Sequence, residues 1–242
     1  MVTGCGRPGP KLSRVLYGRR QGRALRPGRL ALLESLLPRL AVSLPASGAA
    51  PPERLDLAAL FPGAREVWLE IGFGGGEHLA WQAARHPEVG FIGAEHFING
   101  VASLVRLVKE DGLENVRIHQ GDGRDLLAAL PDCALGRVFI LFPDPWRKTR
   151  HHKRRIVQRE TLDSLARVMR DGAELRLATD HRDYLVWMLE RGCAHPAFRW
   201  LARGPGDWRR RPDDWPATRY EAKAIDAGRQ PAYLRFERRP RG

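Results

Sequence analysis

The chain has 242 residues, with 41 Lys or Arg against 28 Asp or Glu, so its formal net charge is +13. This length suits one α/β domain with a sizeable core. The cysteines, Cys5, Cys133 and Cys193, are widely spaced, odd in number and without a C-x-x-C pair, which argues against a disulfide framework or a zinc site.

Residues 1–29 form the first distinct segment, which is rich in Gly, Pro and Arg and has no hydrophobic period. We expect a basic, flexible arm, either disordered or ordered by a partner, followed by a single domain over residues 30–242. Eight basic residues and no acidic residue fall within residues 1–30. Such clustering favours a polyanionic partner, because neutralising phosphates releases counterions. A generally Arg-rich composition is the alternative explanation.

The apolar stretch nearest the N-terminus, LALLESLLPRLAV, is interrupted by Glu34, Pro38 and Arg39. With these interruptions it fits neither a signal peptide nor a membrane span. We therefore expect a cytoplasmic protein in a reducing compartment, with no membrane partner.

From Glu66 onward, short apolar runs alternate with segments of helical periodicity. The runs EVWLEI, VGFIGAE, NVRIHQGD, RVFILF and AELRLATD predict strands. One of the helical segments, residues 154–172, is expected to end at Gly172. This alternation predicts an α/β fold with a mostly parallel sheet and helices on both faces. Two later runs, FRWLAR and YLRFER, predict an antiparallel edge near the C-terminus.

The segment LEIGFGGGEH lies between a predicted strand and a predicted helix, where glycines let the backbone approach a ligand. Gly72 and Gly74 match the first two positions of a G-x-G-x-x-G motif, but Glu77 stands at the third. A dinucleotide pyrophosphate on this helix would meet that carboxylate. The motif therefore disfavours NAD and suits a cofactor without phosphate, such as S-adenosylmethionine.

Acidic residues accompany three successive predicted strands: Glu70 just before the glycines, Glu95 after the second strand and Asp122 after the third. Ligands of open α/β sheets bind at this edge, so we expect all three to contact S-adenosylmethionine. Glu95 suits bidentate acceptance from the ribose hydroxyls, and Asp122 suits the exocyclic amine of adenine. Each residue alone would equally fit a solvated carboxylate, and it is the set that favours a cofactor site.

The segment FPDPWRKTRHHKRR follows the fourth predicted strand. Pro143 and Pro145 leave Asp144 little conformational freedom, which suits a preorganised site, although a structural Asp-Pro turn is the alternative. Trp146 would either stack on a base or cover the core. The adjacent histidines lack metal-ligand spacing, so we expect no metal. We expect the basic residues to contact RNA phosphates, through Arg150, Lys153, Arg154 and Arg155.

Five segments, in this order, resemble the bacterial tRNA (guanine-N7-)-methyltransferase family: LEIGFGGGEHLA, FIGAEHF, FPDPWRKTRHHKRR, LATD and TRYEAKA. The resemblance runs from YGRRQGR to the last predicted strand, and the FPDPW segment is its most specific part. It implies a class I, Rossmann-like methyltransferase fold. It also implies methyl transfer from S-adenosylmethionine to a guanosine of the tRNA variable loop, position 46 in standard tRNA numbering.

The resemblance assigns roles to individual residues. Glu70, Glu95 and Asp122 match cofactor positions, and Asp144 matches a carboxylate that is catalytic or next to the cofactor. The family's substrate-binding positions are matched by Lys148, Asp180, Thr218, Arg219, Tyr220 and Glu221. The chain departs from the family pattern at Arg219, where Lys is usual, and at Glu77 and His78.

The chemistry of guanine N7 agrees with this assignment. N7 has a lone pair and no proton, so its attack on a sulfonium methyl group needs alignment more than a general base. A fixed carboxylate could stabilise the charge that moves onto the purine, or accept hydrogen bonds from guanine N1 and N2. The alternative function is a non-catalytic RNA-binding protein, which the carboxylates disfavour because they would repel a polyanion. The sequence leaves open whether the protein is a monomer or a homodimer.

Overall fold

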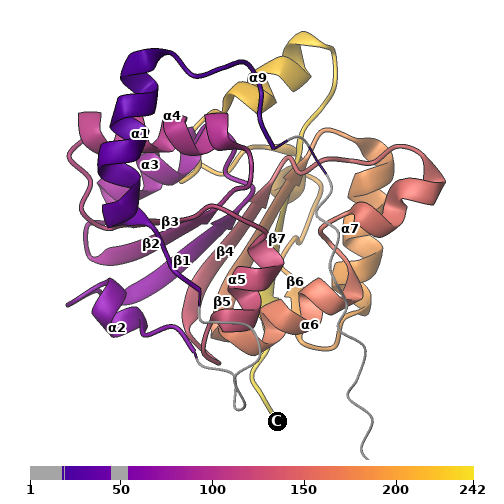
Figure 1. The fold of residues 1–242 in the computed structure, drawn as a ribbon. Helices are drawn as coiled ribbons and strands as arrows, with labels where there is room; N and C mark the ends of the chain where they lie inside the picture. The colour runs from indigo at the N-terminus through magenta and orange to yellow at the C-terminus, as the bar shows by residue number, and fades with distance from the viewer. Residues whose placement is uncertain (1–17, 19, 45–53) are drawn as a thin grey trace, which may run out of the picture.

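The computed structural model describes residues 18, 20–44 and 54–242. Within them, seven strands form one sheet in the order β3-β2-β1-β4-β5-β7-β6 (Figure 1). Strands β1 to β5 are parallel, whereas β7 is antiparallel to both β5 and β6. The strand bounds are β1 Glu66–Ile71, β2 Val89–Ala94, β3 Val116–His119, β4 Leu135–Leu141, β5 Met169–Thr179, β6 Phe198–Trp200 and β7 Ala232–Arg238. The predicted mostly parallel sheet with an antiparallel C-terminal edge is confirmed.

Helices cover both faces of this sheet (Figure 1). One face carries α1 (Pro27–Leu40), α3 (Glu77–Arg85) and α4 (Ile98–Glu110), and the other carries α5 (Gly123–Ala129), α6 (Arg159–Val168) and α7 (Arg182–Ala194). Shorter helices lie in the connections: α2 Leu57–Leu60, the 3-10 helix η1 Thr149–Arg154, α8 Gly206–Arg209 and α9 Arg219–Asp226.

The core is divided by the sheet into two hydrophobic clusters. Along β1, Trp68 belongs to the cluster beneath α3 and α4, while Leu69 belongs to the cluster beneath α5 and α6. This division follows from the alternation of side chains along a strand. In α4, Val101, Leu104 and Val105 are fully buried, as their helical spacing requires. Burying each such side chain contributes about 1.5–3 kcal/mol.

Helix α6 is shorter than the sequence predicted, because it spans Arg159–Val168 and β5 begins at Met169. Met169 is buried and pairs with Leu135, whereas the next paired residue of β5 is Glu174, opposite Arg137. The residues between them bulge out of the ladder. Gly172, with a φ of 77°, provides the turn in this bulge and does not end a helix.

The folded part of the chain begins before residue 30, the boundary expected from composition. Helix α1 starts at Pro27, where the fixed φ of proline favours a first turn. The preceding segment is bonded to the start of α4: Ile98 N donates to Arg20 O at 3.0 Å, and Asn99 Nδ2 donates to Arg23 O at 2.7 Å. The remainder of the expected arm, residues 1–17 and 19, lies outside the described residues.

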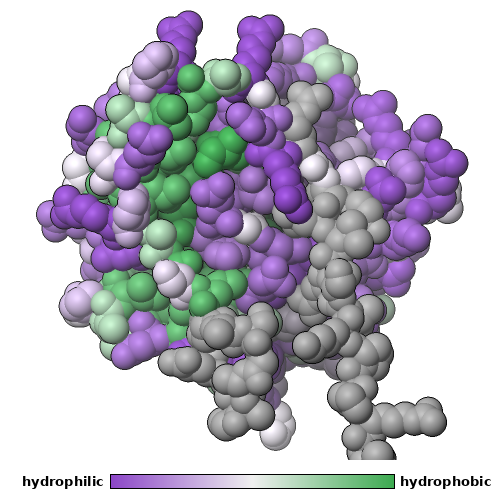
Figure 2. Space-filling model, viewed as in Figure 1, coloured by the Kyte–Doolittle hydropathy of each residue, from purple (hydrophilic) through white to green (hydrophobic). Residues whose placement is uncertain are grey.

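The surface is chemically uneven in the view of Figure 2. Hydrophobic side chains gather toward the left of this view, the side on which α1 lies in Figure 1, and hydrophilic side chains dominate the right, around α7. Leu30 of α1 is one of the exposed large hydrophobic residues. In the part of the chain that the structure describes, no helix combines the length and apolarity needed to cross a bilayer.

Candidate active site

A cavity of about 360 Å³ opens at the C-terminal ends of the parallel strands. It lies where the strand order reverses, because the chain builds β2 and β3 on one side of β1, and β4 and β5 on the other. Ligands of open α/β sheets bind at such a point, and the volume is typical of a small-molecule site. The lining residues include Gly72, Gly74, Glu95, His96, Asp122, Arg124, Asp144, Trp146, Arg154 and Tyr220.

The glycine-rich loop between β1 and α3 meets two other segments at this cavity. Gly74 has a φ of 57°, and a Cβ atom there would lie 2.7 Å from the ring of Tyr220. Gly100 of α4 approaches the same loop, and its Cβ atom would lie 2.1 Å from the carbonyl oxygen of Gly74. Each glycine therefore permits a close approach that any larger residue would prevent. Gly100 was not among the predicted site residues, although a glycine within a helical pattern is a usable signal of close packing.

Glu95 follows β2 and fixes the backbone around the cavity. Its Oε2 accepts a hydrogen bond from Gly74 N, and its Oε1 accepts from the backbone N–H groups of His96 and Phe97, all at 2.9 Å. A carboxylate has about four lone-pair positions, so one acceptor position remains on Oε2. Glu95 can therefore accept from a further donor, and its contact with the ribose hydroxyls stays a prediction.

Asp122 follows β3 and caps α5. Its Oδ1 accepts from Arg124 N at 2.9 Å, and the Arg124 guanidinium contacts both carboxylate oxygens at 2.5–3.0 Å. Both residues line the cavity. A ligand amine at this end of the cavity would share the Asp122 carboxylate with Arg124.

Glu70 lies near the end of β1 but is not among the residues that line the cavity. Its side chain is 5% exposed, and its Oε2 lies 2.7 Å from Nδ1 of His78 in α3. The His78 Nε2 atom contacts Gln82 Nε2 at 3.3 Å. The predicted direct contact between Glu70 and a cofactor is therefore not supported by its position. The buried pair of Glu70 and His78 instead joins α3 to the sheet below the glycine-rich loop.

Asp144 lies on the loop between β4 and η1, and its exposed side chain lines the cavity. Phe142 and Trp146, at the two ends of this loop, have φ values of 50° and 45°. Left-handed backbone at a bulky residue costs of order 1–3 kcal/mol and persists only where the surroundings hold it. Trp146 is half-buried and lines the cavity as well.

The exposed part of the basic segment lies next to this loop. Lys148, Arg150 and Lys153 are exposed, as contact with phosphates requires. The guanidinium of Arg154 lies over the Trp146 ring, 5.0 Å from its centroid, and lines the cavity. These cations therefore lie close in sequence to Asp144, at one edge of the site.

The prediction that Arg155 contacts RNA phosphates is wrong. Its side chain is 1% exposed and cannot reach them. Its Nε donates to the carbonyl oxygen of Pro145 at 2.9 Å, and its Nη2 forms an ion pair with Asp183. A buried guanidinium requires such partners in place of water. Its place in a run of six basic residues gave no sign of this role.

Two of the predicted substrate residues, Thr218 and Glu221, form a capping box at the start of α9. Thr218 Oγ1 accepts from Glu221 N at 3.2 Å, and Glu221 Oε2 accepts from Thr218 N at 3.4 Å. Glu221 is 4% exposed and its carboxylate also binds Tyr233 and Arg211. The structure therefore does not bring the Glu221 carboxylate to the cavity.

The other predicted substrate residues differ in whether they line the cavity. Tyr220 lines the cavity, whereas Asp180 is paired with Arg229 at 2.6 Å and is not a lining residue. Arg219 Nε lies 3.4 Å from Oε1 of Glu77. Arg219 and Glu77 are both departures from the family pattern, and the structure brings them into contact as an ion pair.

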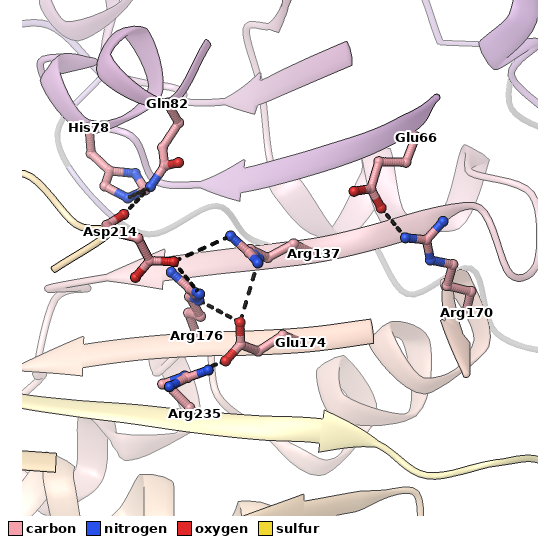
Figure 3. Close-up of polar contacts among 9 residues, drawn as sticks. All are labelled: Glu66, His78, Gln82, Arg137, Arg170, Glu174, Arg176, Asp214 and Arg235. Atoms are coloured by element: carbon pink, nitrogen blue, oxygen red, sulfur yellow. Dashed lines mark hydrogen bonds and ion pairs between the residues drawn. The ribbon is translucent and has the colours of Figure 1, made fainter. Parts of the chain in front are cut away.

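A network of charged residues fixes the loop before α9 to the sheet (Figure 3). Gln82 Nε2 donates to the carbonyl oxygen of Asp214 at 2.8 Å, and Arg176 Nη2 donates to Asp214 Oδ2 at 2.7 Å. Buried Arg176 also binds Glu174 through its Nε at 2.7 Å. Burial acts to raise the pKa of Asp214, but the hydrogen bond and charge of Arg176 outweigh it and hold that pKa below its ordinary value. The network anchors the chain at Asp214, shortly before α9 and Tyr220.

Two histidines near the cavity are held neutral. Burial lowers the pKa of His119, at the end of β3. Partial desolvation, together with the charges of Arg154 and Arg150, lowers the pKa of His151. Both imidazoles are therefore mainly uncharged at pH 7. Among the residues described, no cluster of three or more His, Cys, Asp or Glu side chains could hold a metal ion.

Solved structures with the same arrangement of strands and helices define the class of protein. A 16S rRNA (adenine(1408)-N(1))-methyltransferase from Catenulisporales acidiphilia has a TM-score of 0.51 at 16% identity, covering 77% of this chain and 93% of that chain. An rRNA methylase from Streptococcus thermophilus has a TM-score of 0.51 at 11% identity, covering 76% and 92%. At these identities the likeness shows the fold alone, and that fold is the class I, Rossmann-like methyltransferase fold.

Sequence relatives identify the family within this class. A family described as "Putative methyltransferase" matches residues 64–233. The tRNA (guanine-N(7)-)-methyltransferase of Rhodospirillum rubrum is 55% identical over 93% of this chain and 88% of its own length. That of Paramagnetospirillum magneticum is 54% identical over 93% of each chain. The chain belongs to the tRNA (guanine-N7-)-methyltransferase family, as its motifs predicted.

Proposed function

We propose that this protein transfers a methyl group from S-adenosylmethionine to N7 of a guanosine in tRNA, at position 46 in the variable loop. The observation that carries the proposal is the exposed Asp144 carboxylate, held on a constrained loop at a cavity that Gly74 and Glu95 also line. The names of the family's curated members support the substrate and the atom that is methylated.

The lining of the cavity fits S-adenosylmethionine. The glycine-rich loop leaves room beside Gly72 for a ligand to approach the backbone, and Glu95 retains one acceptor for a ribose hydroxyl. Asp144 adds negative charge that suits a sulfonium cation. The bound cofactor supplies an electrophilic methyl group on positively charged sulfur.

The reaction requires alignment and charge stabilisation from the protein. The lone pair of guanine N7 forms a bond to the methyl carbon while the bond from that carbon to sulfur breaks, and no proton is lost. Positive charge moves onto the purine during this step. Asp144 stabilises that charge or accepts hydrogen bonds from guanine N1 and N2, and its proline neighbours restrict its movement.

The tRNA is held by exposed cations beside the cavity. Lys148, Arg150 and Lys153 are exposed next to the aspartate loop, and Arg20 and Arg23 are exposed on the segment that contacts α4. These charges supply affinity without reading sequence. Trp146 lines the cavity and offers an aromatic face on which the target base can stack.

The proposal is tested by incubating the protein with methyl-labelled S-adenosylmethionine and an unmodified tRNA transcript, then digesting the RNA to nucleosides. We expect the label to elute with 7-methylguanosine, and sequencing of the labelled fragment to place it in the variable loop. Tight binding of tRNA without any label would support the alternative, a non-catalytic RNA-binding protein. Label in another nucleoside would refute the assignment to N7.

A further inference from the structure

Arg155 is a buried cation directly behind the loop that carries Asp144. Its Nε donates to the carbonyl oxygen of Pro145, the residue between Asp144 and Trp146, at 2.9 Å. The side chain itself is inaccessible to solvent. It therefore touches the loop backbone from the core side and has no route to RNA.

Helix α7 holds this guanidinium through three residues of its first two turns. Asp183 forms an ion pair with Arg155 Nη2. The rings of Tyr184 and Trp187 lie 4.8 Å and 5.0 Å from the Arg155 guanidinium carbon. Aromatic faces attract a cation, and the effect is larger when the cation is removed from water. The hydrogen bond from Arg155 to Pro145 thus connects the loop to helix α7.

Helix α7 also fixes the residues that follow Arg155. Trp187 Nε1 donates to the carbonyl oxygen of Val157 at 2.7 Å, and Val157 N donates to the Tyr184 hydroxyl at 3.3 Å. The hydrogen bond from Arg155 keeps the pKa of Asp183 below its ordinary value, so this carboxylate is ionised at neutral pH. The chain on the C-terminal side of Arg155 is therefore anchored to the same helix.

Two residues of the loop cannot donate a backbone hydrogen bond. Pro143 and Pro145 have no N–H group, so neither can donate a backbone hydrogen bond. Phe142 and Trp146 are both in left-handed backbone conformations that the surroundings must maintain. The hydrogen bond from Arg155 to Pro145 lies between Asp144 and the strained Trp146, where a restraint has most effect on both side chains.

We infer that Arg155 and Asp183 are a positioning pair, which sets the Phe142–Trp146 loop so that Asp144 and Trp146 are aligned for methyl transfer. The inference rests on the proposed function. Neither residue touches the substrate, and both act through the Pro145 carbonyl group. Misplacement of a reacting group by about 1 Å can lower a rate by about a hundredfold.

The test uses the full-length protein with Arg155→Lys, Asp183→Asn and the double variant. Lysine keeps the charge, but its single ammonium group cannot reproduce the fork that binds Pro145 and Asp183 together. We expect kcat at saturating cofactor and tRNA to fall about a hundredfold for Arg155→Lys and about tenfold for Asp183→Asn. The KM for tRNA should change by less than about threefold, because phosphate contacts dominate that affinity.

Two further measurements separate positioning from stability. If the two residues act as one unit, the double variant should be no slower than Arg155→Lys alone. Hydrogen exchange of the amides in residues 146–152 should accelerate at least about tenfold, while amides of β1 and β4 keep their protection. The exchange measurement needs neither cofactor nor RNA.

Arg167 and Asp132 provide a matched control. Arg167 also combines an ion pair, to Asp132 at 2.6 Å, with hydrogen bonds to backbone carbonyl groups, those of Leu130 and Leu127. Arg167→Lys and Asp132→Asn should leave kcat and loop exchange unchanged. The inference is overturned if Arg155→Lys keeps normal kcat and loop protection, or if the control variants slow turnover equally. Lack of methyltransferase activity in the wild-type protein would instead refute the proposed function. The hydrogen-exchange comparison of the variants would still test whether Arg155 and Asp183 position the loop.

Discussion

Asp144 combines an exposed carboxylate with a tightly restricted backbone. Prolines flank it on both sides, and the next residues outward, Phe142 and Trp146, are in left-handed conformations. Strain of this kind tends to occur where a side chain must be held for function. The other carboxylates at the cavity, Glu95 and Asp122, are instead engaged with backbone N–H groups or with Arg124. Asp144 is thus the acidic residue best placed to act on a substrate.

Replacing Asp144 with Ala should separate chemistry from binding. We expect turnover at saturating cofactor and tRNA to fall by on the order of a hundredfold or more, because a charge-stabilising group is lost from the transition state. Affinity for tRNA should stay the same or rise slightly as a negative charge is removed. Single-turnover kinetics, filter binding and thermal unfolding measure the three properties. Unfolding of the variant, or a normal rate, would make the aspartate a structural turn residue.

Glu95→Ala should weaken binding of S-adenosylmethionine by about 1–3 kcal/mol, the range for losing a charged hydrogen-bond partner. Part of this loss arises because the N–H groups of Gly74, His96 and Phe97 lose their common acceptor. Glu95→Gln keeps an acceptor oxygen and should lose less affinity. Isothermal titration calorimetry with both variants tests this order, and equal losses would show that the charge alone matters.

At the scale of elements, the site is assembled from segments that are distant in sequence. Helix α9 brings Tyr220 against the glycine-rich loop, and the chain before this helix is anchored by Asp214 to Arg176 in β5 and to Gln82 in α3 (Figure 3). The close approach of α4 depends on Gly100. Displacement of either helix would therefore change the shape of the cavity without altering a residue that touches the ligand.

Asp214→Asn tests the anchoring of α9 through pH. The pKa of Asp214 in the folded state is lowered from its ordinary value of 3.8. Its ion pair therefore stabilises the folded protein at pH values above 3.8. This contribution is lost as the pH falls through the lower folded-state pKa. The wild-type protein should therefore be the more stable at pH 6, and the difference should shrink as the pH falls below 3.8. Urea unfolding of both proteins across this range measures it, and a difference independent of pH would exclude the ion pair as its cause.

At the scale of the whole molecule, part of the architecture could be predicted and part could not. The five parallel strands were predictable because short, largely apolar runs alternate with helical periodicity, and the ends of parallel strands necessarily meet at one edge. Burial of Arg155 was not predictable, because it depends on α7, which begins 27 residues later in the sequence. The T-x-x-E pattern of Thr218 and Glu221 is typical of a capping box, whereas the family resemblance predicted substrate binding for both residues.

The position of the exposed cations predicts how tRNA binding responds to salt. Replacing Lys148, Arg150 and Lys153 with Ala should reduce the slope of log affinity against log salt by up to about 2–3, because fewer counterions are released. A control variant replaces Arg65, Arg85 and Lys109, which are exposed near the opposite ends of the strands and helices. The control should keep the wild-type slope, and equal slopes for the two variants would place the RNA elsewhere.

We propose that this cavity directs methyl transfer to N7 of a guanosine in tRNA. The most direct test of this proposal compares an unmodified tRNA transcript with the same transcript made with 7-deazaguanosine, which has a carbon atom in place of N7. We expect both RNAs to bind with similar affinity, and only the RNA that contains N7 to acquire the labelled methyl group. Equal methylation of the 7-deaza transcript would contradict the account, because the accepting atom would then lie elsewhere on the RNA.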